Sequence, residues 1–330
     1  MATDLSPLSR ALKNVSSPGW RISLLALLAV IVSLVFMTLH LQGNISYVLK
    51  HRGQILFTIV LVAFASGIST LLFQTITQNR ILSPSVMGLE SLFVFIQTLL
   101  VFFVQLSQLS QVGSMVPFLG ETALLMIFAT LLYRWLFNRS GLDLHRVLLT
   151  GLVFGTLFRS LSGLMQRLLS PGEFAVLQSR MFATITHADP AVLALSAVLI
   201  AAITIIVWRI RHRLDVIALG RNSATALGVP FQRYVTGLLL LVSLLVAIST
   251  ALVGPMTFLG LLVVNLAWPV VGSWRHRYLL PGTVLIGIIM LTGGQLILEQ
   301  VFNMAGTLSV IIEFLGGGLF IYLILKKVAT

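Results

Sequence analysis

Long apolar runs repeat along the whole chain, separated by short segments that contain polar residues, glycine or proline. A helix needs about 20 predominantly apolar residues to cross a membrane, and most of these runs are close to that length. The eighth run begins at Gly254-Pro255 and is shorter than a full crossing, so a pair of half-helices is an alternative to one straight rod there. We predict ten membrane-spanning helices, at residues 20–41, 55–78, 87–106, 117–137, 144–168, 190–208, 234–253, 257–271, 280–298 and 308–325.

The composition agrees with a polytopic membrane protein. Hydrophobic residues make up 58% of the 330 residues, charged residues make up 9%, and the mean hydropathy is +1.04. A soluble globular protein carries about 45–50% apolar and about 25% charged residues, so this chain cannot supply a solvent-facing surface. Ten spans use roughly 200 residues, which leaves no room for a second, soluble domain. We predict a single all-α integral membrane domain over residues 1–330, with its first run as an uncleaved anchor.

The distribution of basic residues predicts the orientation. The chain carries 21 Lys and Arg against 9 Asp and Glu, a formal net charge of +12. In a soluble protein this balance suggests nucleic acid, but short basic clusters between apolar runs are typical of membrane orientation. With a cytoplasmic N-terminus, only Lys50, Arg52, Arg159, Arg167 and Arg180 fall on the outer side. The other sixteen fall inside: Arg10, Lys13, Arg21, Arg80, Arg134, Arg139, Arg146, Arg209, Arg211, Arg213, Arg221, Arg233, Arg275, Arg277, Lys326 and Lys327. We therefore predict both termini in the cytoplasm and no nucleic-acid partner.

The residues that common catalytic and metal sites require are missing. The chain has no cysteine, no lysine follows a glycine as in a Walker A loop, and no His-Glu-x-x-His pattern is present. No serine has a suitable His and Asp partner. We therefore expect no catalytic residue, no cofactor and no metal site. If the chain moves a solute uphill, the energy comes from a partner protein or from an ion gradient.

The longest polar segment, residues 209–233, is predicted to fold. Leu214–Leu219 can form a short helix that stops at Gly220, and Asn222 or Ser223 can cap a second helix through Leu227. Gly228 then ends the second helix, with Pro230 just beyond it. The result is a compact unit with apolar tips at Leu219, Leu227 and Val229. An amphipathic loop lying on anionic lipid is the alternative.

Four sequence blocks resemble the FecCD family, the permease subunits of ABC importers for ferric siderophores, haem and vitamin B12. The run ALGRNSATALGVP is similar to the cytoplasmic coupling segment of that family. The block at residues 254–282 and the spacing of Gln74, Asn79, Pro84 and Gly88 also match. The C-terminal FLGGGLFIYLILKK completes the series in the correct order. Arg80 stands where the family commonly has a proline, and Trp268 where it commonly has an arginine.

The resemblance implies a type II ABC importer permease fold of ten transmembrane helices in a bacterial cytoplasmic membrane. It implies a second permease subunit, two cytoplasmic ATPase subunits, and a periplasmic or lipid-anchored binding protein. The departures from the family pattern favour a heterodimer, with a homodimer as the alternative. The implied cargo is a ferric siderophore, with a catecholate favoured by the outer basic residues. A haem or cobalamin permease and, from another class, an ion-coupled secondary transporter are the alternatives.

The resemblance also assigns residues to two contact surfaces. The coupling segment would present Leu219, Gly220, Ala224, Leu227, Gly228 and Val229 to the ATPase. At the outer face, binding proteins of the family present acidic residues to permease arginines. Arg52 matches that position, and Lys50 is a neighbouring candidate by charge.

Two polar stripes within the spans are candidates for the translocation pathway. Ser66, Thr70 and Gln74 recur at helical spacing in the second span, and close helix packing is the alternative interpretation. In the fifth span, Ser162 and Gln166 lie on the same side as Arg159, which would be costly facing lipid. The alternatives for Arg159 are the membrane interface or a pair with an acid such as Glu299. Gly151-x-x-x-Gly155 in the same span predicts close packing.

Overall fold

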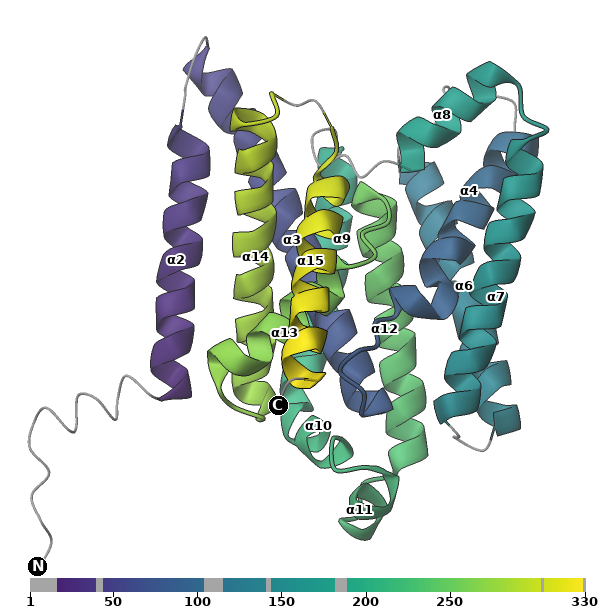
Figure 1. Cartoon of the computed structure of the whole chain (residues 1–330), viewed down its shortest axis with the longest axis vertical. Coiled ribbons are helices and arrows are strands. Elements are labelled where there is room, and N and C mark those ends of the chain that lie inside the picture. The colour runs from purple at the N-terminus through teal and green to yellow at the C-terminus, as the bar shows by residue number, and fades with distance from the viewer. Residues whose placement is uncertain are drawn as a thin grey trace, which may run out of the picture.

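The structure is a computed structural model that describes residues 17–39, 44–103, 115–140, 144–181, 189–303 and 306–328. Within these ranges the chain consists of helices and connections, with no β-strand (Figure 1). The elements are α2 (Pro18–Thr38), α3 (Ile45–Thr77), the π-helical turn η1 (Ser85–Leu89), α4 (Glu90–Phe103), α6 (Met115–Ser140), α7 (Leu144–Gln166), α8 (Pro171–Met181), α9 (Pro190–Arg209), α10 (Arg211–Ile217), α11 (Arg221–Ala226), α12 (Phe231–Val253), α13 (Leu259–Val271), α14 (His276–Gln300) and α15 (Leu308–Val328).

Each predicted apolar run contains a helix in the described part of the chain, with η1 and α4 sharing the third run. Helices α2, α3, α9, α12 and α14 are long and apolar enough to cross a membrane, and α4 and α13 are shorter apolar helices. The outermost helix, α2, buries little, because Leu24, Leu27 and Leu34 on its surface are 55–60% exposed. Contiguous apolar surface of this kind marks a membrane-facing helix in a chain with this composition. The prediction of an all-α polytopic membrane protein is confirmed.

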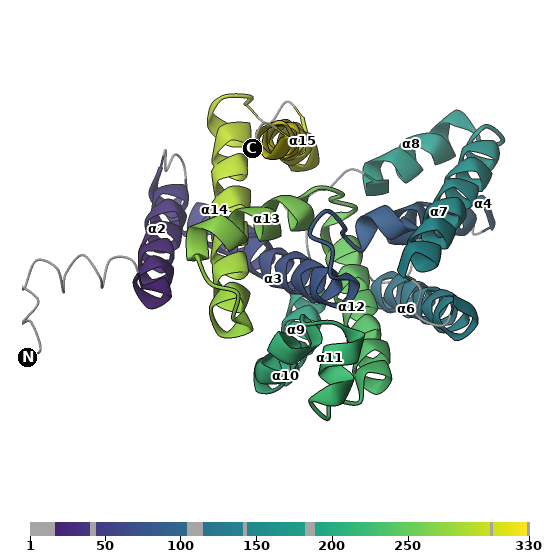
Figure 2. The ribbon, with the colours of Figure 1, turned by 60° about the horizontal axis from the view of Figure 1, so that its bottom comes forward.

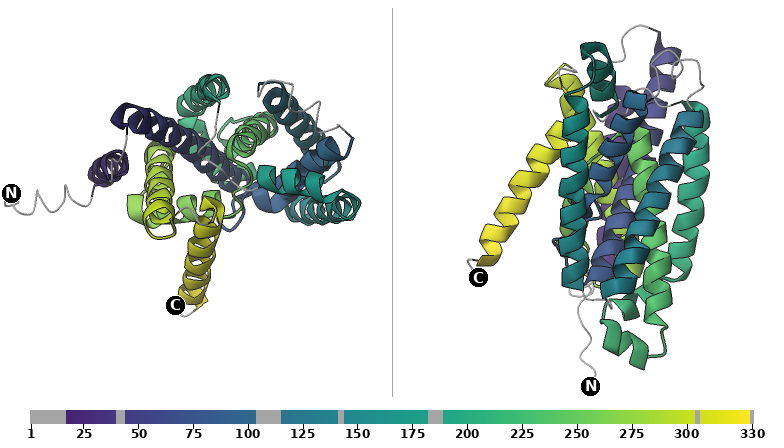
Figure 3. Two further views of the ribbon diagram at one scale, coloured as in Figure 1. Left: turned by 90° about the horizontal axis from the view of Figure 1, so that it is seen from above. Right: turned by 90° about the vertical axis from the view of Figure 1, so that its right-hand side faces the viewer.

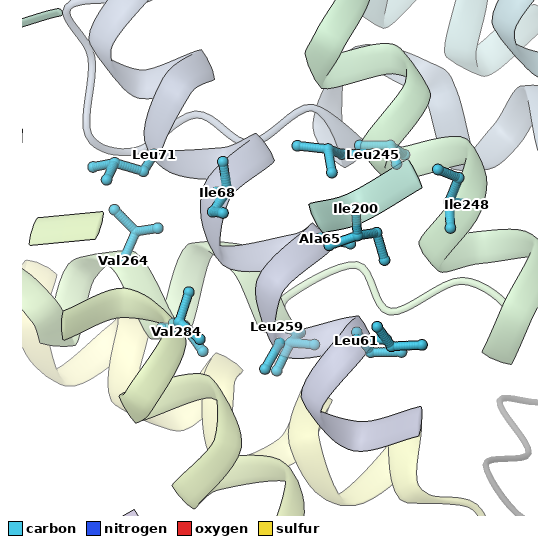
Figure 4. Packing of buried hydrophobic residues seen from close by; sticks show 14 of the residues in the cluster. Leu61, Ala65, Ile68, Leu71, Ile200, Leu245, Ile248, Leu259, Val264 and Val284 are labelled. Atoms are coloured by element: carbon cyan, nitrogen blue, oxygen red, sulfur yellow. The ribbon is translucent and has the colours of Figure 1, made fainter. Parts of the chain in front are cut away.

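Helix α3 is the centre of the bundle. Its 33 residues span about 50 Å, more than the hydrocarbon core of about 30 Å, and it runs obliquely through the middle of the molecule (Figure 3). It packs against α9, α12, α13 and α14. Residues from all five helices interlock in one apolar core (Figure 4), among them Leu61, Ala65, Ile68, Ile200, Leu245, Ile248, Leu259 and Val284.

A second group of helices, α4, α6 and α7, packs beside this core, with α12 between the two groups (Figure 2). In this second group, the backbones of η1 and α7 lie very close together. Gly88 has φ of 90°, which favours glycine, and a Cβ there would lie 2.8 Å from Gly155 Cα and 3.1 Å from the Gly151 carbonyl oxygen. The packing role predicted for the two glycines of α7 is therefore confirmed.

Two of the apolar helices are too short to cross the membrane as straight rods. Helix α12 ends where Gly254 adopts φ of 84°, and α13 has 13 residues, a length of about 20 Å. Helix α4 has 14 residues and follows the break at η1. The eighth run is thus a single short helix, as its length predicted, rather than a pair of half-helices.

The two ends of the bundle differ. Helix α2 begins and α15 ends at the end that carries α10 and α11, as an even number of spans predicts (Figure 1). The opposite end carries α8, which begins with a capping box in which the Ser170 amide donates to Glu173 Oε2 at 2.9 Å. The Ser170 hydroxyl donates to the same oxygen. The two hydrogen bonds hold the pKa of the exposed Glu173 carboxyl below its usual value.

Candidate functional site

The segment between α9 and α12 folds as two short helices, α10 and α11, which project from one end of the bundle (Figure 1). Gly220 with φ of 97° separates them. Helix α11 ends in a Schellman motif, in which the Gly228 amide donates to the Thr225 carbonyl and the Val229 amide to the Ala224 carbonyl. Gly228 has φ of 80°, so a larger residue would be strained there. The predicted pair of helices and both glycine stops are present.

Two details of this segment differ from the sequence prediction. Helix α11 begins at Arg221 directly after Gly220, so Asn222 and Ser223 lie inside it and neither caps it. Leu219 and Leu227 are 61% and 63% exposed, as expected for apolar tips. Ala224, in contrast, has no exposed surface, and Val229 packs against the main core. Ala224 therefore supports the segment from inside and cannot touch a partner, which corrects its assignment as a contact residue.

A buried histidine joins this segment to two membrane helices. His276, the first residue of α14, is fully buried, and its backbone amide and Nδ1 donate to Asp215 Oδ1 of α10 at 2.8 and 2.7 Å. Its Nε2 lies 2.8 Å from Thr75 Oγ1 of α3. Partial burial raises the pKa of Asp215, but the hydrogen bonds and charge of His276 outweigh it, so the net pKa lies below the usual value. Helix α10 is thus joined by hydrogen bonds to α14 and, through His276, to α3.

The C-terminal end of α3 also touches the coupling segment. The side-chain amide of Gln78 packs on Gly220, where an added Cβ would lie 2.8 Å from its Nε2. Gln78 itself has φ of 51°, because it ends α3 in the left-handed conformation. Helix α3 therefore meets the segment both directly and through His276.

A polar cluster lies near the start of the two short membrane helices, α4 and α13. Glu90, the first residue of α4, accepts a hydrogen bond of 2.6 Å from Thr257, two residues before α13. Glu313 of α15 faces the same hydroxyl, and Arg159 of α7 interacts electrostatically with Glu90. Arg159 Nη2 also lies 3.5 Å from Ser91 Oγ and is otherwise exposed. Helix N-termini carry partial positive charge, and broken helices with ionisable residues commonly mark transport sites.

Two residues of the predicted polar stripe of α7 have hydrogen-bond partners on α7 and α4. Ser162 is buried and donates to the Phe158 carbonyl of its own helix at 2.7 Å. Gln166 Nε2 donates to Thr98 Oγ1 of α4 at 3.2 Å. All three stripe residues therefore have partners inside the subunit, and Arg159 is the most exposed of them.

The polar stripe of α3 is packed rather than open. Thr70 lies against Gly260 of α13 so closely that a Cβ at Gly260 would overlap its Oγ1, and Ser66 lines the same contact through its carbonyl oxygen. Gln74 Nε2 donates to the Arg80 carbonyl at 2.7 Å. In this conformation these residues position α13 and the 78–84 connection.

Sequence reasoning missed the role of the two residues that depart from the family pattern. The side chain of Arg80 lies over two indole rings that also contact each other, with its Cζ 4.3 Å from the centroid of Trp268 and 4.2 Å from that of Trp274. The guanidinium beside Trp268 thus comes from the connection that follows α3. The signal available in the sequence was that both residues differ from the family pattern: Arg80 adds an arginine, and Trp268 stands in place of one. Two such differences in one chain suggest that the residues lie at the same place.

At the opposite end of the bundle, Arg52 has internal partners. Its Nη1 donates to the Phe36 and Leu39 carbonyls at the C-terminus of α2, and its Nη2 lies 3.7 Å from Glu299 Oε2 of α14. The side chain is only 12% exposed. Glu299, considered as a partner for Arg159, is therefore next to Arg52 instead. Lys50 is exposed.

Within the described ranges, no three His, Cys, Asp or Glu side chains come together as a metal site. The arrangement has the parts of a transport protein instead: a projecting unit with apolar tips, buried links from it into the membrane helices, and an ionisable cluster at a helix break.

Comparisons with known proteins agree with this arrangement. Residues 22–326 match the sequence profile of the FecCD transport family. The petrobactin import system permease protein YclO of Bacillus subtilis (strain 168) is 43% identical over 307 residues, which cover 93% of this chain and 97% of that protein. The petrobactin import system permease protein FatC of Bacillus anthracis is 37% identical over 280 residues, covering 85% and 79%.

A solved structure of a metal-chelate type ABC transporter in an inward-facing conformation has the same fold. Its TM-score is 0.82 at 22% sequence identity, covering 94% of this chain and 100% of the other. The family match extends over nearly the whole chain and the fold agrees with it. The chain belongs to the FecCD transport family.

Proposed function

We propose that this chain is a permease subunit of an ATP-driven importer for a ferric siderophore of the petrobactin class. The observation that carries this proposal is the 43% identity to YclO, extending over 93% of this chain and 97% of that protein. The permeases named for haem or other siderophores are more distant, such as HmuU of Yersinia pestis at 27% and FepD of Escherichia coli at 28%. A catecholate-type iron complex is therefore the favoured cargo.

The chain works with partners that supply energy and substrate. Two ATPase subunits bind at the α10–α11 end. The exposed side chains of Leu219 and Leu227 are apolar there, and a bound partner would shield them from water. A second permease subunit completes the pathway, with a heterodimer favoured, and a periplasmic or lipid-anchored binding protein delivers the cargo. The chain itself hydrolyses no ATP. It lies in the bacterial cytoplasmic membrane with both termini in the cytoplasm, which the excess of Lys and Arg at that end supports.

ATP-driven motion reaches the pathway through α3 and α14. Asp215 moves with the coupling segment, and its hydrogen bonds to His276 pull on the first turn of α14. Thr75 transfers the same motion to α3. Because α3 packs against α13 at Gly260, a shift of α3 also displaces α13, whose N-terminus adjoins Glu90.

Arg159 is the pathway residue that we assign to the anionic cargo. It is exposed on α7, and Glu90, the acid with which it interacts, already accepts a hydrogen bond from Thr257. Gln166 joins α7 to α4 through its hydrogen bond to Thr98 and so helps to fix the position of Arg159. Ser162, which donates within α7, lies on the same side of the helix. Ser66, Thr70 and Gln74 border the pathway from α3 by positioning α13 and the loop after α3.

At the outer face, Lys50 offers the accessible charge for docking of the binding protein. Arg52 supports that surface indirectly, because it joins the end of α2 to α14.

Uptake in cells that lack their own siderophore permeases tests the assignment of cargo. The chain is expressed with its partners, and accumulation of iron is compared for ferric petrobactin, a ferric hydroxamate and haem. We expect uptake of ferric petrobactin well above the other two. Preferential uptake of haem or of the hydroxamate would overturn the assignment of the cargo.

A further inference from the structure

An apolar groove of about 250 Å³ lies between α3, α9 and α14. Its one polar lining residue, Thr204, donates its hydroxyl to the Ile200 carbonyl at 2.7 Å, so the groove has no free polar group to hold water. The groove is open to the surface, since Trp208 in its wall is 40% exposed. It is lined by Phe64, Ile68, Thr204, Val207, Trp208, Leu280, Pro281, Val284, Leu285 and Ile288.

The length of the groove matches one leaflet of a membrane. Its lining on α14 extends from Leu280 to Ile288, a rise of about 12 Å. Half of the hydrocarbon core of a bilayer is about 15 Å thick. The groove begins within two turns of the α14 start at His276 and of the α9 end at Arg209. It therefore opens at the α10–α11 end of the bundle and extends inward across most of that leaflet.

Both helical stripes that line the groove end in an arginine at this end. On α14, Arg277 precedes Pro281 by four residues and Leu280 by three, so it lies on the same helix face. Beyond α9, Arg211 stacks on the groove residue Trp208, with Cζ 4.6 Å from the ring centroid, and donates to its carbonyl at 3.0 Å. The buried Arg211 Nε has no hydrogen-bond partner among the described residues.

The surroundings of the groove mouth are strongly basic. The one acid in α10, Asp215, is already engaged by His276. Pockets that combine a basic rim with an apolar interior between membrane helices suit the head groups of anionic lipids. Within five residues of the lining residues Trp208 and Leu280, the sequence carries Arg209, Arg211, Arg213, Arg275 and Arg277.

We propose that this groove binds an anionic phospholipid, with one acyl chain against Trp208 and Ile288 and the phosphate between Arg211 and Arg277. The lipid then bridges α9 and α14 directly beside the coupling segment. The assignment to the cytoplasmic leaflet rests on the orientation proposed above, whereas the groove and its arginines do not depend on it.

Lipid retention measured by native mass spectrometry on the purified full-length chain tests the proposal independently of transport. The probes are phosphatidylglycerol and phosphatidylcholine with identical acyl chains, added in equal amounts. We expect preferential retention of phosphatidylglycerol, lowered roughly 5-fold by Arg211→Gln and by Arg277→Gln, since each arginine near a membrane surface contributes about that factor. Arg233→Gln, at an exposed arginine on α12, is the matched charge control and should change nothing.

Filling the groove should remove the lipid without altering the arginines. Ile288→Trp and Thr204→Phe each place a larger side chain in the groove and should abolish the preference, whereas Ile206→Trp on the exposed opposite face of α9 should keep it. Equal retention of the two lipids overturns the proposal, and so does a preference that survives in both filled variants.

A second measurement serves if a filled variant does not fold. Phosphatidylglycerol with brominated acyl chains should quench tryptophan fluorescence in the native chain, and Trp208→Phe should remove most of that quenching at this site. Identical quenching in the two proteins would mean that the acyl chain is not in the groove.

Discussion

Asp215 caps a helix that lies 61 residues away in sequence, because its Oδ1 accepts hydrogen bonds from both the backbone amide and the ring Nδ1 of His276. The first amides of a helix lack partners within the helix and favour a negative charge. Asp215 thus stabilises the start of α14 and ties the coupling segment to it. A loop that only connected two spans would not need such an attachment.

Asp215→Asn should weaken this attachment in a pH-dependent way. Because Asp215 is partly exposed, we expect a loss of stability of only about 1 kcal/mol at neutral pH. The pKa of Asp215 is lowered in the folded protein, so its stabilisation is complete above the ordinary aspartate pKa of about 3.9 and is lost as the pH falls through the lower, folded value.

Thermal unfolding of the purified native chain and of Asp215→Asn, from pH 7 down to pH 3, measures this difference. The difference in stability between the two proteins should stay constant near neutral pH and become smaller only in acid. Asn222→Ala, on the exposed surface of α11, is the control. A gap that is absent at pH 7, or that widens in acid, would contradict the assignment.

Substitutions at the exposed tips of the coupling segment should affect ATPase binding, whereas a substitution in its interior should affect stability. Leu219→Asp together with Leu227→Asp removes two exposed apolar side chains and should weaken binding of the ATPase by roughly 10-fold or more, with unchanged thermal stability. Ala224→Leu overfills a buried site and should lower the stability by about 1–3 kcal/mol. Copurification of the ATPase and thermal unfolding distinguish the two effects. Full ATPase binding by the double variant would show that the tips are not the contact.

Arg159→Ala should lower siderophore uptake roughly 10-fold or more at subsaturating substrate, because a charge-assisted hydrogen bond to the cargo is lost. Arg159→Lys retains the charge but not the planar fork, so uptake should be intermediate. Arg167→Ala, an exposed arginine one residue beyond the end of the same helix, should have little effect. The measurement is initial uptake at matched expression. If Arg159→Ala transports normally, the residue has a structural role only.

At the outer face, Arg52→Ala and Lys50→Ala should behave differently. Arg52→Ala removes the ion pair to Glu299 and the hydrogen bonds to the carbonyls at the end of α2, and it should cost about 1–3 kcal/mol of stability. Lys50→Ala should leave stability unchanged and weaken binding-protein docking less than about 5-fold, since exposed ion pairs contribute about 0–1 kcal/mol. Docking titrations at low and high salt, together with thermal unfolding, test both. Docking that depends on Arg52 alone, at unchanged stability, would reverse these roles.

The positions of the apolar helices could be predicted from the sequence because membrane spans are specified locally, whereas α8 lies outside every predicted run. Each span was recognisable from the length of its apolar run, and Gly220 and Gly228 indicated where the two short helices of the coupling segment end. Leu219 and Leu227 were predictable as exposed tips for the same reason: each lies next to a helix stop.

The remaining features depend on contacts between distant segments, which periodicity does not reveal. Ala224 is small and carries no signal of its burial. The family resemblance suggested an external partner for Arg52, but carbonyl groups of α2 accept hydrogen bonds from it within the chain. His276 pairs with Asp215 and Thr75 across 61 and 201 residues, so only the folded chain brings them together.

ATP-dependent uptake in proteoliposomes tests the central claim most directly, that this chain is a permease driven by a partner ATPase through α10–α11. The chain is reconstituted with its sister permease and binding protein, with or without the ATPase, and uptake of ferric petrobactin is followed with and without ATP. We predict uptake only when ATPase and ATP are both present, and its loss when Leu219→Asp and Leu227→Asp are combined. Uptake by the chain without the ATPase, driven by an imposed ion gradient, would contradict the account.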